Sequence, residues 1–128
     1  MKFIALIYVS PEDAAKGDPE QIEAHLDFAE SAIRAGAYVT CDGLEPPLNA
    51  RTVRVRDGQA IVTDGPFAET KEVLGGFYVL DCDTMDEAVA MAARIPPATA
   101  GAIEVRPVAV IPGWDEALAA RTAAIATA

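Results

Sequence analysis

Runs of apolar residues, and positions that alternate between apolar and polar, predict the strands of this chain. The segment 3–9 is continuously apolar, which is typical of a strand covered on both faces. Asp57-Gly58 lies between the alternating segments 52–56 and 60–63, and this dipeptide in such a context is a strong signal for a β-hairpin. Further strands are expected at 37–41, 76–82 and 103–111.

Apolar residues at helical spacing predict three helices between and after these strands. Asp18 caps the first helix, which Gly36 ends, and Thr84 opens the second as the first residue of a capping box. An alanine-rich segment at 114–126 is expected to form the third helix. The inner stripe of the first helix is expected to consist of Ile22, Leu26, Ala29 and Ile33.

The resulting order is β-α-β, hairpin, β-α-β, followed by a helical tail. It predicts an α+β fold with the ferredoxin-like split pattern, in which two helices cover one face of an antiparallel sheet. The strands are too apolar for the other face to be bare in water. We therefore expect a homodimer in which the two sheets face each other.

Composition and charge narrow the classes of partner. The chain has 128 residues, 52% of them hydrophobic, and a formal net charge of −10. That charge repels nucleic acid and anionic lipid, so neither is an expected partner. Cys41 and Cys82 are expected to be reduced thiols outside any metal site. The apolar run near the N-terminus is too short to span a membrane and precedes Glu12-Asp13, so we expect a cytoplasmic protein.

The run VTDGPFAETKE at 62–72, followed by LGGFY at 74–78, resembles the signature of the DGPF-type branch of the YCII-related family. The resemblance covers about residues 1–111 and implies a dimeric α+β barrel arrangement. Residues 112–128 lie outside it and are expected to form a helical extension.

His25 is the only histidine, and it lies on a broad apolar face of the first helix. An imidazole titrates near neutrality and can act as a general acid or base. It can equally be a structural residue whose ring bonds a backbone carbonyl. The family resemblance implies a histidine at this place on the first helix, paired with an aspartate, and gives the catalytic role of His25 as much weight as the structural one.

Asp64 is the expected partner of His25, because it opens the rigid Gly65-Pro66 turn of the DGPF run. A carboxylate that accepts from one ring nitrogen orients the other nitrogen toward a substrate. Asp before Gly-Pro also caps its own turn, and this interpretation of Asp64 is slightly favoured, although one carboxylate can fill both roles. Asp42 is the alternative partner for the histidine.

Other residues are weaker candidates for ligand contacts. Gly75 and Gly76 form either a bulge or the mouth of a pocket, and Phe67 is either a wall of the site or a core aromatic. Arg106, on the last strand, can hold a carboxylate ligand or pair with Glu104 on a solvated strand face.

Two functions follow, and the sequence leaves open whether the protein is an enzyme. The first is a lyase or isomerase that acts on a small molecule through a His–Asp pair, without a metal or organic cofactor. The resemblance implies it, because some relatives act on lactones by elimination or dehalogenation. The alternative is a non-catalytic dimeric module that binds a ligand or a protein. DGPF-type proteins are often linked with extracytoplasmic-function sigma factors, which implies an accessory role in transcription regulation.

Overall fold

A computed structural model describes residues 1–15 and 18–128 of the chain. The elements in chain order are β1 (Lys2–Val9), α1 (Pro11–Ala15), α2 (Pro19–Arg34), β2 (Tyr38–Gly43), η1 (Pro47–Asn49), β3 (Arg51–Arg56), β4 (Gln59–Asp64), β5 (Val73–Asp81), α3 (Met85–Ala92), η2 (Pro96–Thr99), β6 (Ala102–Pro107) and α4 (Trp114–Ala126).

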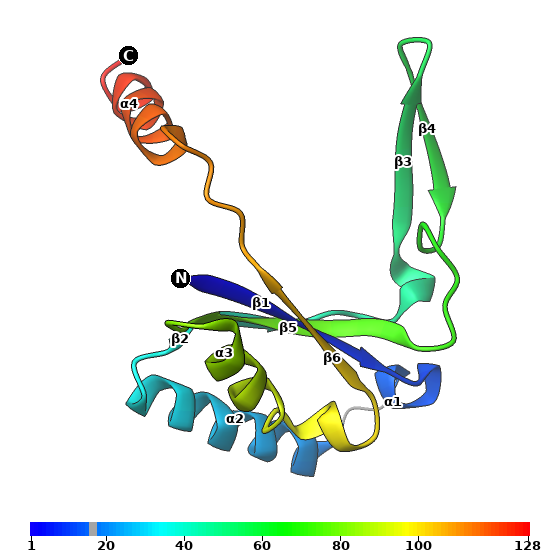
Figure 1. Cartoon of the computed structure of the whole chain (residues 1–128). Coiled ribbons are helices and arrows are strands. Elements are labelled where there is room, and N and C mark those ends of the chain that lie inside the picture. The colour runs from blue at the N-terminus through cyan, green and yellow to red at the C-terminus, as the bar shows by residue number, and fades with distance from the viewer. Residues whose placement is uncertain (16–17) are drawn as a thin grey trace.

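Four strands form one sheet in the order β2-β5-β1-β6, and all its neighbours are antiparallel. Helices α2 and α3 lie on one face of this sheet (Figure 1). This is the strand order of the ferredoxin-like split pattern, with β3 and β4 inserted as a separate two-stranded sheet. The predicted α+β fold class is therefore confirmed.

The core lies between the sheet and the two helices. Phe3, Ala5 and Ile7 alternate inward along β1, and they are buried together with Leu80 of β5 and Ala88 of α3. The intervening β1 side chains point to the other face and are only partly buried. Within one chain, β1 is therefore covered by helices on one face only. The chain itself does not cover the other face, for which the sequence predicts a second subunit.

Helix α2 begins as the sequence predicts but buries a different stripe. The Asp18 side chain accepts a hydrogen bond of 3.0 Å from the backbone N–H of Glu20. Phe28 and Ala32 are buried, whereas Ile22, Leu26 and Ile33 of the expected inner stripe are 58–60% exposed. The expectation was wrong because two apolar rows run along this helix. Phe28 lies on the second row, and its ring packs edge-on against Tyr78 with centroids 4.9 Å apart.

Three other boundaries differ from the sequence prediction or sharpen it. The expected polar connection at 10–16 contains the short helix α1. Strand β6 ends at Pro107 instead of continuing to 111, and its ladder with β1 ends at the pair Phe3–Pro107. Thr84 is the N-cap of α3, and its side chain accepts a hydrogen bond from the N–H of Glu87 as the capping box predicts.

The β3–β4 hairpin and α4 project from the sheet on the side away from α2 and α3 (Figure 1). Asp57 and Gly58 have φ angles of 51° and 74°, which are the positive values that a two-residue type I′ hairpin turn requires. The predicted hairpin is thus confirmed. Among the strand residues of the hairpin, Thr52 is partly buried and the others are exposed. No residue of α4 is buried.

Candidate functional site

A cavity of about 600 Å³ lies between the first half of α2 and the adjoining ends of β1, β2 and β5. The apolar residues of the lining include Ile7, Val9 and Leu44, and helix η2 contributes prolines. The polar residues of the lining are His25, Tyr78, Cys41, Gln21, Asp13, Asp18 and Asp42. The volume falls in the range that is usual for small-molecule sites, about 300–1,000 Å³.

His25 points from α2 toward β5, where it contacts Tyr78. Its Nδ1 atom lies 2.8 Å from the Tyr78 hydroxyl oxygen, and the two rings stack with centroids 5.9 Å apart and planes 21° apart. Tyr78 is buried, and His25 is partly buried beside the cavity. The alternation along β5 places Tyr78 on the helix-facing side with Leu80, and so sets this contact.

A second contact of the Tyr78 hydroxyl bears on the tautomer of the imidazole. This oxygen also lies 3.5 Å from the His25 carbonyl oxygen, which can only accept. Both contacts are satisfied when the hydroxyl donates to the carbonyl and accepts from Nδ1–H. The ring then carries its free lone pair on Nε2, so this geometry leaves Nε2 as the basic nitrogen.

Burial changes the acidity of both rings. It lowers the pKa of His25, because a partly buried imidazole is less easily charged. Burial, followed by the nearby Cys41 and Tyr38, raises the pKa of Tyr78 to about 12. At neutral pH the pair is therefore an uncharged imidazole beside an uncharged phenol, which is a state suited to accepting a proton at the histidine.

Cys41 lines the cavity, and Tyr38 contacts Cys41 from outside the lining. Cys41 lies directly opposite Tyr78 in the β2–β5 ladder, and its sulfur is 3.4 Å from the Tyr38 hydroxyl oxygen. That hydrogen bond is the main cause of a raised pKa of Tyr38. Both cysteines are free thiols, with Cys41 partly buried and Cys82 buried.

The structure does not bring Asp64 to His25 within the chain. The Asp64 carboxylate accepts a hydrogen bond of 2.6 Å from Arg51 at the base of the hairpin, and its side chain is 88% exposed. Asp64 is not among the residues that line the cavity, whereas Asp42 is. The backbone of the DGPF turn has the expected form, because Gly65 has a φ of 93°.

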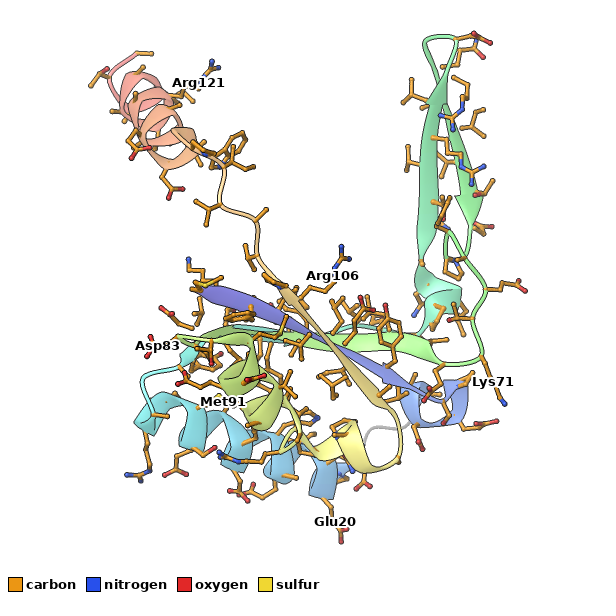
Figure 2. The ribbon with its side chains drawn as sticks, in the orientation of Figure 1. Glu20, Lys71, Asp83, Met91, Arg106 and Arg121 are labelled. Carbon is orange, nitrogen blue, oxygen red and sulfur yellow. The ribbon has the colours of Figure 1, made fainter. Side chains whose placement is uncertain are left out.

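The predicted ligand-binding residues lie in different places. Gly75 and Gly76 line the cavity. Phe67 is 75% exposed outside it, and the Arg54 guanidinium lies 5.1 Å from the centre of its ring. Arg106 is also outside the cavity and extends from the side of the sheet away from the helices (Figure 2).

Gly76 has a structural reason to be glycine. A Cβ atom there would lie 2.8 Å from the carbonyl oxygen of Asp42 and 3.3 Å from the Cα of Gly43. At Gly75 the closest neighbour would be the Val9 side chain, at 3.2 Å. The close approach of β2 and β5 at Gly76 shapes the floor of the cavity.

Tyr78 is the residue that the sequence analysis did not single out for chemistry. It lies in the LGGFY run, and strand alternation from Gly76 would have placed it on the same face as that glycine. Among the described residues, no group of three or more His, Cys, Asp and Glu side chains is arranged to hold a metal ion. In the same residues, no helix is long and apolar enough to cross a bilayer.

Comparison with known proteins adds a family and a fold. A family model described as the YCII-related domain matches residues 1–112. An uncharacterized protein of Rhizobium meliloti (strain 1021) is 45% identical over 99 residues, which are 75% of this chain and 80% of the relative.

A solved structure of 5-chloro-2-hydroxyhydroquinone dehydrochlorinase from Burkholderia phenoliruptrix AC1100, in complex with 2,5-dihydroxybenzoquinone, is similar with a TM-score of 0.50. It shares 15% identity and covers 85% of this chain and 94% of its own, a likeness that shows the fold alone. The DGPF-type branch stays a prediction. The family match spans most of the chain, and on that ground the protein belongs to the YCII-related family.

Proposed function

We propose that the protein is a cofactor-independent lyase or isomerase for a small molecule, and that the cavity beside His25 is its active site. The observation that carries this proposal is the His25–Tyr78 contact at the cavity wall. It occupies Nδ1, lowers the freedom of the ring to rotate, and leaves Nε2 as the proton acceptor. A base held in one orientation beside an apolar cavity is what proton abstraction from carbon requires.

In the proposed elimination, Nε2 of His25 takes a proton from a carbon of the substrate. The electron pair of that C–H bond forms the new double bond, and a leaving group departs from the adjacent carbon with its own bonding pair. The imidazolium then returns its proton to water. In an isomerisation the same imidazolium returns the proton to another carbon of the substrate.

Within one chain, neither expected carboxylate is in contact with His25. The Asp64 carboxylate is paired with Arg51, and Asp42 lies opposite Phe77 in the β2–β5 ladder, so its side chain is on the face away from the helices. Tyr78 takes the orienting role that the sequence analysis gave to Asp64, because its hydroxyl is the group in contact with Nδ1.

The fold neighbour supports a small ring compound as the ligand. Its name describes a dehydrochlorinase, and its structure holds 2,5-dihydroxybenzoquinone. A cavity of about 600 Å³ has ample room for a molecule of that size. We extend this to the present chain as a proposal about substrate class: an uncharged or weakly acidic ring that bears a leaving group.

The test is a panel of halogenated hydroquinones and halogenated lactones, assayed for halide release. The His25→Gln variant should lower kcat/KM by about 10²–10⁴-fold, the usual contribution of a general base. Glu23→Gln, on an exposed part of the same helix and outside the cavity lining, is the matched control and should leave turnover unchanged. Full turnover in the His25→Gln protein would contradict the mechanism.

We also propose that the protein is a homodimer whose open sheet faces pack together. Ile4, Leu6, Phe77 and Val79 share the face away from the helices and are only partly buried within one chain. Such a face is stabilised when a second apolar surface covers it. The cytoplasmic location stays a prediction.

The second candidate function is that of a protein-binding accessory module. The observation that favours it is α4, whose Trp114, Leu118 and Ile125 side chains are 51–77% exposed. Under this proposal α4 docks in a groove of another protein. Leu118→Ser and Ile125→Ser should then abolish capture of that partner without changing the fold, whereas turnover in the halide assay should be unaffected.

A further inference from the structure

The sequence and position of the β3–β4 hairpin fit a surface on another molecule. Within the described residues its two strands pair only with each other, and in Figure 1 it stands out from the open face of the sheet. An isolated two-stranded hairpin is at best marginally stable in water. This hairpin therefore needs a covering surface that its own chain does not supply.

The register of the hairpin gives it two unlike faces. Cross-strand partners share a face, so Val53 and Val62 lie together with the pair Val55 and Ala60. Val53, Val55 and Val62 are 55–61% exposed, and we call this side the valine face. The opposite face carries Arg54 and Arg56, and Arg54 already lies over the Phe67 ring.

The charge of the hairpin is opposite to that of the rest of the chain. Residues 51–64 contain three arginines and two aspartates, a net charge of +1. The whole chain has a net charge of −10, so the remainder has −11. Arg54 and Arg56 lie on the face opposite the valine face, so the attraction to the acidic body of a second copy acts through the long-range field and not through contact pairs.

We propose that the β3–β4 hairpin is an arm that clasps a second copy of this chain, with its valine face toward that copy. The proposal rests on the pairing of open sheet faces suggested above and goes beyond it, because it assigns a separate contact surface to the arm. A twofold axis lets both copies satisfy both surfaces at once.

The dimensions of the arm agree with this arrangement. Six residues per strand extend about 20 Å, whereas two packed sheets lie about 10 Å apart. An arm that rises from the open face therefore reaches past the sheet of the second copy to the level of its helices. There α2 presents Ile22, Leu26 and Ile33, an apolar stripe that is exposed in the single chain.

Neighbouring residues of β4 provide a matched test of the valine face. Val62 and Ile61 are 55% and 48% exposed and point to opposite faces of the arm. By sedimentation equilibrium, Val62→Ser should raise the dimer dissociation constant by about ten-fold or more, and Ile61→Ser should change it far less. Equal effects, or no effect of Val62→Ser, would overturn the docking of this face.

A second pair of variants tests the charge. Arg56→Glu and Arg121→Glu change the net charge equally, but Arg56 lies on the arm and Arg121 on α4. Arg56→Glu should weaken the dimer more than Arg121→Glu at low salt, and the difference should shrink as salt is raised. An equal loss in both proteins would show net repulsion alone and would overturn the electrostatic role of the arm.

These measurements separate the arm from the other proposals. A wild-type protein that is monomeric at all concentrations overturns both the arm and the pairing of sheet faces. A stable wild-type dimer that tolerates Val62→Ser overturns the arm alone. In the proposed mechanism halide release depends on His25 of one chain. The halide assay therefore tests the proposed enzyme, and the sedimentation measurements test the arm.

Discussion

The Nδ1 atom of His25 on α2 lies 2.8 Å from the hydroxyl oxygen of Tyr78 on β5, a residue 53 positions later in the chain. The two residues form one wall of the cavity. The phenol leaves one imidazole nitrogen free for chemistry and stays protonated at neutral pH, because its own pKa is raised to about 12. This contact is the basis of the first prediction.

Tyr78→Phe should lower the pKa of His25 further. In the assigned tautomer the hydroxyl accepts from Nδ1–H, and the charged imidazolium loses more than the neutral ring when that acceptor is removed. Titration of His25 followed by NMR measures the shift, and ring ¹⁵N chemical shifts report which nitrogen carries the proton. A rise in the pKa would mean that the hydroxyl donates to Nδ1 instead.

His25 should make the protein less stable as the solution is acidified toward mild acid. Burial lowers the pKa of His25 in the folded state, so the unfolded chain binds the proton more readily. The unfolded state is therefore stabilised relative to the folded state as pH falls. The stability is fully present above the unfolded pKa and decreases below it. Urea unfolding from about pH 8 to about pH 5.5 should show this slope in wild type and a flatter profile in His25→Gln.

Gly76→Ala should destabilise the fold, whereas Gly75→Ala should be tolerated. The new methyl group at position 76 would meet backbone atoms of Asp42 and Gly43, which cannot move aside without separating β2 from β5. We expect a loss of about 1–3 kcal/mol in the free energy of unfolding. At position 75 the neighbour is the end of the Val9 side chain, so the loss should be below about 1 kcal/mol. Equal losses in the two denaturation curves would contradict this account.

Asp64→Asn separates the two roles of that carboxylate. If the Arg51–Asp64 pair is its main contact, the change should cost about 1 kcal/mol or less, because both side chains are largely exposed. The pKa of His25 and the rate of halide release should not change. A clear shift of the His25 pKa in the variant would show that Asp64 lies close to a histidine. Because Asp64 does not reach His25 of its own chain, that histidine would be His25 of a second copy.

The sequence by itself determined the order of the strands with α2, α3 and α4, and the position of the hairpin. Those features depend on short-range chemistry: Asp57-Gly58 adopts the positive φ angles of a tight turn, and Asp18 and Thr84 cap helices within three residues of themselves. It also identified His25 as the titratable group of interest, because it is the one histidine of the chain.

Only the tertiary structure decided which partner His25 meets and which face of α2 is buried. Periodicity shows that a helix has an apolar side, but α2 has two such rows, and the rotation that buries Phe28 and exposes Leu26 depends on its fit against Tyr78. The DGPF turn similarly has its predicted backbone, and Asp64 pairs with Arg51, its cross-strand partner in the hairpin. The hairpin projects from the face of the sheet away from α2, so it carries Asp64 away from His25 (Figure 1). Contacts between distant residues depend on how whole elements pack, and local sequence patterns do not contain that information.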